Sequence, residues 1–280
     1  MKLMMTLLVR DEQDILRENL EFHLAQGVDE FILMDNLSVD ATREIAREYE
    51  RAGCLHYVAQ PNDDYAQGRW VTEMARRAAL EFGADWVINN DADEFWWPHT
   101  GSLKDVFASI APDTEAAAAD RVNFIPRVQN GSPFWRLMNV RQTLSLNALG
   151  EPLPSKTAHR GRPDIVVDQG NHRVTAGGVV IPSTAAPITI LHFPIRSQSQ
   201  FMNKIAKGGA AYARNTDLAV TVGSAWRYLY ALYLDDRLES WYAEQVFSDD
   251  AVAAGLANGT LLHDERLSRT LVEVIEEVAA

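Results

Sequence analysis

Three acidic side chains stand close together in this sequence, directly after a short apolar run. Asp91, Asp93 and Glu94 follow the run 86–88. Carboxylates this close repel each other unless a cation or a shared proton offsets the repulsion. Mg²⁺ and Mn²⁺ prefer oxygen ligands, so the cluster predicts a divalent-cation site. The alternative is a solvated turn in which the three acids face water.

Ahead of this cluster, short apolar runs alternate with amphipathic stretches. Such alternation predicts βα units and a mainly parallel sheet of nucleotide-binding type. In open sheets of this kind, ligands bind beyond the carboxyl ends of the strands, where the acidic cluster falls. Strands are predicted at residues 3–9, 31–34, 55–59 and 86–88, and helices at 14–26, 40–53 and 71–82.

Composition excludes several classes of protein. The chain has 280 residues with 47% hydrophobic and 23% charged, which is typical of a globular protein. A net charge of −13 argues against binding nucleic acid or an anionic membrane surface. Cys54 is the single cysteine, so no internal disulfide forms. The apolar run 3–9 is too short for a signal peptide or a membrane span. We therefore expect a cytoplasmic protein without a transmembrane segment, with a peripheral position at a membrane left open.

Four segments in combination resemble the family 2-like glycosyltransferases of GT-A fold. The resemblance covers roughly the first hundred residues. Each segment is a weak signal, whereas the combination is specific. The segments contain Arg10-Asp11-Glu12, Glu21-Phe22-His23-Leu24, Asp35-Asn36-x-Ser38-x-Asp40 and Asp91-x-Asp93-Glu94.

The resemblance implies a fold, a donor and a cofactor. The fold would be α/β, with a GT-A (Rossmann-like) mixed, mainly parallel sheet flanked by helices and a helical C-terminal region. The donor would be a nucleoside-diphosphate sugar, such as a UDP- or GDP-sugar. Asp91 and Asp93 would form a DXD motif that holds Mn²⁺ or Mg²⁺ on the diphosphate. Asp35, next to Asn36, would contact the nucleoside, and Glu12 takes the place of the glutamate that follows strand one in the family.

Basic residues are candidates for binding the diphosphate. Arg10 ends the first predicted strand and Arg69 opens a predicted helix. Each is equally explained by a solvated surface ion pair. Lys204, followed by Lys207-Gly208-Gly209, could belong to a mobile basic flap over the diphosphate. Ordinary helix termination explains the same residues.

An inverting transferase needs a general base for the acceptor hydroxyl. Asp168, Glu94 and His172 are candidates, and we favour Asp168, although a simple turn with Gly170 explains that segment equally well. His192 follows an apolar strand at 188–191. In related GT-A enzymes a histidine in the C-terminal half completes the metal shell, so the resemblance implies that role for His192; a packed core histidine is the alternative.

The segments suggest a division of the chain. We expect a nucleotide-sugar-binding half at 1–115, an acceptor-binding and metal-completing half at 116–223, and a helical appendage at 224–280. Apolar stripes on the last helices would pack against the domain, a partner or a second copy in a homo-oligomer.

The leading hypothesis is a metal-dependent, inverting hexosyltransferase. It would move a sugar to a carbohydrate or other hydroxyl acceptor in glycan or polysaccharide synthesis. A sugar-1-phosphate nucleotidyltransferase is the first alternative, but the glycine-rich loop of that class is replaced here by Arg10-Asp11-Glu12. A catalytically silent glycan- or nucleotide-binding domain is the second.

Overall fold

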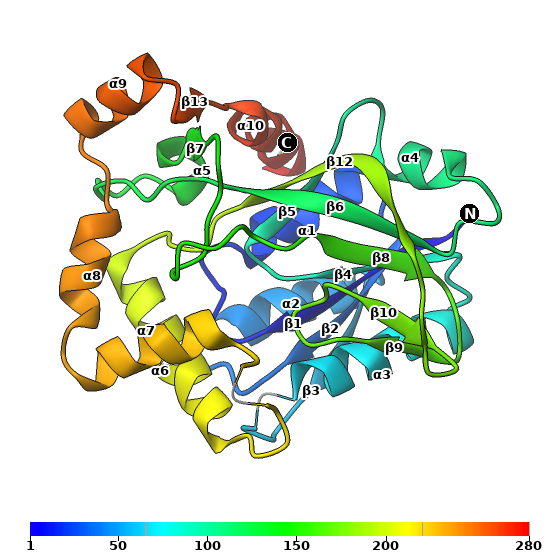
Figure 1. The fold of residues 1–280 in the computed structure, drawn as a ribbon. Helices are drawn as coiled ribbons and strands as arrows, with labels where there is room; N and C mark the ends of the chain where they lie inside the picture. Colours follow the sequence, from blue (N-terminus) through cyan, green and yellow to red (C-terminus); the bar gives the residue numbers. More distant parts are fainter. Residues whose placement is uncertain (65, 220, 280) are drawn as a thin grey trace. The chain divides into compact units, whose positions relative to one another are not determined.

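A mixed eight-stranded sheet forms the centre of the fold (Figure 1). The computed structural model describes residues 1–64, 66–219 and 221–279, with side chains through residue 274. The strand order is β3-β2-β1-β4-β8-β6-β12-β5. These strands are β1 (Leu3–Val9), β2 (Glu30–Asp35), β3 (Leu55–Ala59), β4 (Trp86–Asn90), β5 (Glu94–Pro98), β6 (Ala116–Asn123), β8 (Lys156–Arg160) and β12 (Ser183–His192).

Strands β1 to β4 are parallel, and β8 runs antiparallel to both β4 and β6. Four helices belong to this part of the chain, namely α1 (Leu16–Ala25), α2 (Thr42–Arg51), α3 (Gln67–Leu80) and α4 (Leu103–Ser109). Met4, Ile32 and Val87 pack against Trp70 and Met74 of α3. Successive strand side chains point to opposite faces, and the neighbours of these residues are buried too, so both faces of the sheet are covered.

The predicted α/β class and the four parallel strands are confirmed. The first helix begins at Leu16, two residues later than predicted, because Asp11 takes a left-handed φ of 55° in a turn after β1. A further strand of the sheet, β6, follows α4. Its run of alanines pairs with β8, where small side chains fit a buried position between two strands.

A second, smaller sheet packs on α3. It contains β9 (Ile165–Val167), β10 (Val174–Ala176) and β11 (Val179–Val180), all antiparallel. Thr72 fastens β9 to α3, because its Oγ1 accepts the Val167 N–H at 2.9 Å. Figure 1 shows α3 alongside β9 and β10.

The chain forms two compact units. The first is built from Met1–Asn62, Ala66–Arg121 and Pro154–Ile190, and the second mainly from Val122–Leu153 and Leu191–Ala280. The predicted helical C-terminal region is confirmed, while the three-part division of the chain stays a prediction and Ala280 lies outside the described residues. The second unit contains α5 (Phe134–Leu137), β7 (Val140–Gln142), α6 (Gln198–Arg214), α7 (Ser224–Leu234), α8 (Leu238–Gln245), α9 (Asp249–Ala257), β13 (Leu261–His263) and α10 (Arg266–Ala279). Within the described residues, every helix is too short or too polar to cross a membrane.

The predicted flap or helix end at Lys207-Gly208-Gly209 is wrong, because α6 continues through these residues to Arg214. A Cβ on Gly208 would lie 2.5 Å from Cζ3 of Trp226, and a Cβ on Gly209 would lie 2.4 Å from Cβ of Tyr230. The two glycines therefore allow α7 to approach α6 closely.

Replacing Gly209 with alanine tests the close packing of α6 against α7, because the free energy of unfolding should fall rather than rise. In an exposed helix, Gly→Ala stabilises by about 1 kcal/mol. Because the new Cβ would collide with Tyr230, we expect Gly209→Ala to lower the free energy of unfolding by about 1–3 kcal/mol instead. Urea denaturation measures the difference, with Ala213→Gly on the exposed side of α6 as a control for propensity. A stabilised Gly209→Ala protein would contradict the close contact.

Candidate functional site

The carboxyl ends of β1 and β4 meet where the strand order reverses. From β1 the chain goes to β2 and β3 on one side, and then returns to β4 on the other. Ligands of open α/β sheets bind at such switch points. Two non-glycine residues beyond strand ends here have left-handed backbones, Asp11 after β1 (φ 55°) and Leu37 after β2 (φ 63°). Strained conformations of this kind occur preferentially at functional sites.

Hydrogen bonds join the loops after β1 and β2. The Asp11 N–H donates to Oγ of Ser38 at 3.0 Å, and Oδ1 of Asp11 accepts the Val39 N–H at 2.8 Å. The Glu12 N–H donates to Oγ1 of Thr42 at 2.8 Å, and Glu12 is largely buried. The two loops therefore form one braced surface beside the switch point.

Asp35 and Asn36, at the end of β2, stabilise the same pair of loops through buried hydrogen bonds. The Asp35 side chain is fully buried; its Oδ1 accepts the Ser38 N–H at 3.0 Å and its Oδ2 accepts the Tyr57 hydroxyl at 2.8 Å. The Asn36 amide donates to the carbonyl oxygens of Gln60 and Asn62 at 3.1 and 2.6 Å. Asp35 thus stabilises the turn that leads into α2, and its predicted contact with the nucleoside stays a prediction.

The turn between β4 and β5 carries the acidic cluster. The Glu94 N–H donates to the Asp91 carbonyl at 3.0 Å. Asn19 of α1 holds this turn, because its Nδ2 donates to the carbonyl oxygens of Ala92 and Glu94, both at 2.9 Å. Asp93 is 3% exposed. The helix after the first strand therefore fixes the backbone of the acidic residues.

His23, one turn further along α1, supports the same segment. Its Nδ1 lies 2.8 Å from the Asn19 carbonyl oxygen, and its Nε2 accepts the Trp96 N–H at 3.2 Å. These partners define a neutral ring with the proton on Nδ1. Burial away from water lowers the pKa of His23 to about 3.

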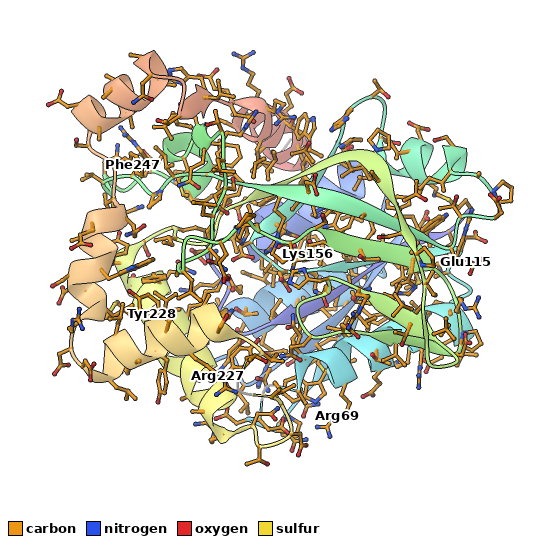
Figure 2. The ribbon with its side chains drawn as sticks, in the orientation of Figure 1. Arg69, Glu115, Lys156, Arg227, Tyr228 and Phe247 are labelled. Carbon is orange, nitrogen blue, oxygen red and sulfur yellow. The ribbon has the colours of Figure 1, made fainter. Side chains whose placement is uncertain are left out.

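Lys156, the first residue of β8, places its ammonium inside the acidic cluster. Nζ lies 2.5 Å from Oδ2 of Asp91 and 3.2 Å from Oε1 of Glu94. Arg121 of β6 reaches the same Glu94 oxygen with Nη1 at 3.2 Å. Lys156 is 1% exposed, so its charge is almost fully withdrawn from water. Figure 2 shows Lys156 on β8, in the middle of the sheet.

Glu94 is buried among these charges. Burial raises its pKa to about 7, although the positive charges of Lys156 and Arg121 act in the opposite direction. No hydrogen-bond donor of the described residues reaches its second oxygen, Oε2. A carboxylate in this state still attracts a cation or a proton.

The loop after β9 meets Asp91 from the other side. Nδ2 of Asn171 lies 3.3 Å from Oδ1 of Asp91, and Nε2 of Gln67, the first residue of α3, lies 3.4 Å from the same oxygen. Oε1 of Gln67 also accepts the Gly170 N–H at 3.1 Å. The loop, the start of α3 and the end of β4 therefore converge on one carboxylate.

Two candidate bases lie in this loop. His172 is close enough for the charges of Lys156 and Arg121 to act on it; burial is the largest cause that lowers its pKa, to about 4. Its Nδ1 lies 2.9 Å from the Ser155 carbonyl oxygen, so Nε2 carries the lone pair. Asp168 is paired with Arg173 at 2.6 Å and its side chain is 30% exposed.

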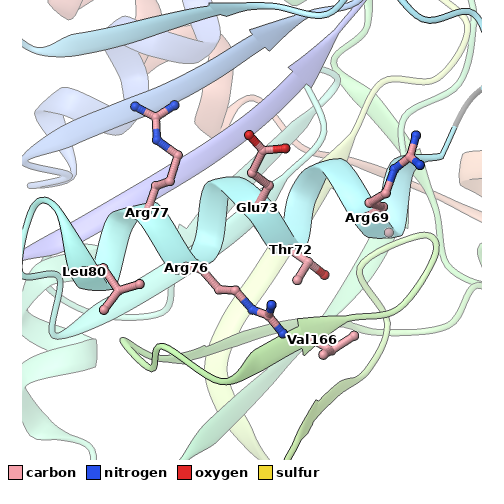
Figure 3. Close-up of a pocket in the computed structure, with 8 residues that line it drawn as sticks. Arg69, Thr72, Glu73, Arg76, Arg77, Leu80 and Val166 are labelled. Carbon is pink, nitrogen blue, oxygen red and sulfur yellow. The ribbon is translucent and has the colours of Figure 1, made fainter.

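The structure brings Asp91, Glu94 and His172 together around Lys156. Arg69 is exposed and lines a groove of about 600 Å³ along α3 with Arg76 and Val166 (Figure 3). Arg10 is half-buried at the end of β1. The roles predicted for these two arginines in binding the diphosphate stay predictions.

His192 and Lys204 lie in the second unit. Nδ1 of His192 is 2.7 Å from Oδ1 of Asn123, whose Nδ2 donates to the Leu146 carbonyl oxygen at 3.0 Å. This amide orientation makes Nδ1 of His192 the donor in that hydrogen bond. The Lys204 ammonium lies 5.9 Å from the ring centre of Trp226. Their predicted roles as metal ligand and phosphate contact stay predictions.

The residues that hold the acidic cluster were not predicted from the sequence. They are Asn19, Gln67, Arg121, Lys156 and Asn171. Lys156 gave no local signal, because it lies 65 residues from Asp91 along the chain. The others are polar residues without a local pattern.

The donor set fits a cation. Asp91 already binds a cationic group, the ammonium of Lys156, and Oε2 of Glu94 is buried without a donor among the described residues. No group of three or more His, Cys, Asp or Glu side chains of the described residues is placed to hold a metal ion. Mg²⁺ is usually held by one or two carboxylates, with phosphate oxygens and water completing its shell. The predicted role of Asp91 and Asp93 as these two carboxylates stays a prediction.

The family model of glycosyltransferase family 92 matches residues 5–199. The chain belongs to glycosyltransferase family 92. The match includes most of β1, the acidic turn, Lys156 and the loop at 168–172. The predicted glycosyltransferase is therefore confirmed, but the match is to family 92 and the resemblance to family 2 is not supported specifically. Membership also decides against a nucleotidyltransferase and a silent binding domain.

Solved structures resemble this family 92 protein at low identity. Residues 1–349 of S. aureus TarS are 15% identical, with 99% of this chain and 92% of that chain covered and a TM-score of 0.41. The same protein in complex with UDP-GlcNAc matches at 15% identity over 84% and 72%, with a TM-score of 0.43. Glucosyl-3-phosphoglycerate synthase from Mycobacterium tuberculosis, with Mg²⁺ and UDP, is 20% identical over 34% of both chains, with a TM-score of 0.24. A comparison with curated protein sequences gives no match.

The buried His23 makes stability depend on pH. The pKa is about 3 in the folded family 92 protein and about 6.5 in an unfolded chain. Between these values the unfolded chain binds a proton that the folded protein does not, so stability falls as the pH is lowered. One such histidine contributes about 1.4 kcal/mol per pH unit. We expect urea denaturation between pH 7 and 5 to show a shallower loss of stability in His23→Gln; equal slopes would contradict a neutral buried ring.

Proposed function

We propose that this family 92 enzyme transfers a sugar from a nucleoside-diphosphate sugar to a hydroxyl acceptor, with inversion and with Mn²⁺ or Mg²⁺ as cofactor. The observation that carries the proposal is the acidic turn after β4, which lies at the switch point of the sheet. Donor phosphates would bind at this edge. The acceptor would be a carbohydrate or another hydroxyl compound in glycan or polysaccharide synthesis.

The nucleoside would bind on the braced loops after β1 and β2. Asp35 and Asn36 are buried and hydrogen-bonded, so this surface is rigid before the donor arrives. A preformed surface loses little conformational entropy on binding. Glu12 lies in the same pair of loops. We propose a UDP- or GDP-sugar as donor, because the sequence resemblance to GT-A glycosyltransferases implies such a donor.

Asp91 and Asp93 would hold the divalent cation on the diphosphate. When bound, such an ion stabilises the negative charge that develops on the leaving nucleoside diphosphate. Asp91 is 32% exposed and so reaches solvent, whereas Asp93 is nearly buried. Gln67 and Asn171 orient the Asp91 carboxylate, since both donate to Oδ1.

The first turn of α3 would add favourable electrostatics. Gln67 opens this helix and touches Asp91, so the positive end of the helix dipole lies beside the acidic turn. Backbone N–H groups at a helix N-terminus favour phosphate. Arg10 and Arg69 remain our candidates for further neutralising the diphosphate.

Asp168 is our candidate for the general base of an inverting reaction. Its carboxylate is partly exposed and ion-paired with Arg173, so an acceptor hydroxyl could reach it. The Glu94 side chain is fully buried and is already ion-paired with Lys156 and Arg121. His172 has a pKa of about 4, so its neutral ring would be a weak base. These differences support Asp168 over the other two.

Binding of nucleoside diphosphates tests the metal site. We expect Asp93→Ala to lose the Mn²⁺-dependent binding of UDP or GDP, because one of two carboxylates for the ion is removed. Calorimetric titration with and without Mn²⁺ measures this loss. Asp113→Ala, which removes an equal charge from an exposed loop, should bind as the unchanged protein does. The same titration on His192→Ala tests its predicted part in holding the ion.

Equal affinity of the unchanged protein for UDP and GDP in excess chelator would refute the metal requirement. Failure of both nucleotides to bind under any condition would refute the proposed donor. The two results are separate, because the first concerns only the cofactor.

Replacing Asp35 tests the nucleoside surface. We expect Asp35→Ala to weaken binding of the preferred nucleoside diphosphate by about 1–3 kcal/mol, the usual cost of a lost buried hydrogen-bond partner. Stability should fall as well, because Asp35 accepts the Ser38 N–H. Tyr57→Phe removes one donor to Asp35 but keeps the carboxylate, so it should lose stability while retaining affinity. Unchanged affinity of folded Asp35→Ala would place the nucleoside elsewhere.

A further inference from the structure

Lys156 is a buried lysine whose partners are all acidic residues of the proposed donor site. Its side chain is among the largest that are fully buried in the described residues, at 1% exposure. Buried lysines are rare unless paired, because removing the ammonium from water is costly. The negative charges of Asp91 and Glu94 therefore stabilise the buried ammonium of Lys156.

The contact of Lys156 with Asp91 occupies a carboxylate that the divalent cation would also use. Nζ lies 2.5 Å from Oδ2 of Asp91, and the amide donors of Gln67 and Asn171 approach the other oxygen, Oδ1. A cation that coordinates Oδ2 must take the place of Nζ. The ammonium and a divalent ion also repel each other at such short distances.

The charges around the turn explain why the ammonium is there. The turn carries the three carboxylates of Asp91, Asp93 and Glu94. Lys156 forms ion pairs with Asp91 and Glu94, and Arg121 forms one with Glu94. Oε2 of Glu94 lacks a donor among the described residues. Without Lys156, the turn would hold adjacent carboxylates with little to offset their repulsion.

We propose that Lys156 is a tethered counter-ion that competes with the divalent cation for Asp91. This inference rests on the proposed metal-dependent function. In the protein without donor, the ammonium neutralises Asp91 and keeps its affinity for the cation low. A nucleoside diphosphate changes the balance, because its phosphate oxygens give new ligands to the cation and a new anionic partner to the ammonium. The cation and the nucleotide would therefore bind together, and each would bind weakly alone.

Mn²⁺ alone, without nucleotide, is the probe for this competition. We expect calorimetric titration to show that Lys156→Met binds Mn²⁺ at least about tenfold more tightly than the unchanged protein, since the competing charge is gone. Mn²⁺ should also raise the melting temperature of Lys156→Met more than that of the unchanged protein, because a ligand that binds the folded state stabilises it.

Arg121→Met is the matched control. It removes one buried positive charge beside Glu94, and the contacts of Arg121 are with Glu94 and the Pro154 carbonyl oxygen rather than with Asp91. Its gain in Mn²⁺ affinity should therefore be clearly smaller than that of Lys156→Met. Equal gains would mean that net charge, and not competition for Asp91, sets the affinity, and would overturn the proposal.

A second pair of variants covers the case in which Lys156→Met does not fold. Glu94→Gln removes the acidic partner that is most deeply buried, so Lys156→Met/Glu94→Gln leaves no buried carboxylate at position 94 without its lysine. Arg121 keeps its hydrogen bonds to the Pro154 carbonyl oxygen in both variants. We expect the double variant to bind Mn²⁺ more tightly than Glu94→Gln.

Unchanged or weaker Mn²⁺ affinity after loss of Lys156, or no Mn²⁺ binding by either protein, would overturn the inference. Absence of nucleotide binding would refute the proposed donor, yet the comparison with Mn²⁺ alone would still be interpretable. If nucleotides bind with Mn²⁺ as proposed but Lys156→Met leaves the affinity for Mn²⁺ unchanged, only the counter-ion role falls.

Discussion

The ammonium of Lys156 between Asp91 and Glu94 is the interaction on which the candidate site depends. Three carboxylates lie in one turn and two of them, Asp93 and Glu94, are buried, so their mutual repulsion needs compensation. Lys156 supplies a positive charge 2.5 Å from one and 3.2 Å from another, and Arg121 supplies a second. Strand β8 pairs antiparallel with β4, and the register of this pairing places Lys156 beside the acidic turn.

The surrounding elements hold the turn from several sides. Asn19 of α1 binds two of its carbonyl oxygens, and Gln67 of α3 with Asn171 of the 168–172 loop bind its first carboxylate. These contacts come from helices and a loop that the sheet positions, so the geometry is set before any ligand binds. A site built in this way can distinguish ligands by charge and position.

Family 92 membership assigns the chemistry to glycosyl transfer, while the arrangement of charges suggests how it is controlled. A site with negative net charge attracts cations and repels a free diphosphate. Cation and nucleotide together cancel this repulsion, which would favour donor binding as a complex with its metal ion. The ammonium of Lys156 offsets part of the repulsion between the carboxylates of the turn.

The sequence by itself determined the parallel strands, the α/β class and the acidic turn after β4, because alternation of apolar and polar residues is a local property. It also gave the transferase class through four short segments. The tertiary structure decided which charges meet: Lys156 lies 65 residues from Asp91, and Asn171 lies 80 residues away. It also decided that Gly208 and Gly209 lie inside a helix, against Trp226 and Tyr230. Such pairings depend on strand register and helix packing, which no local pattern of residues specifies.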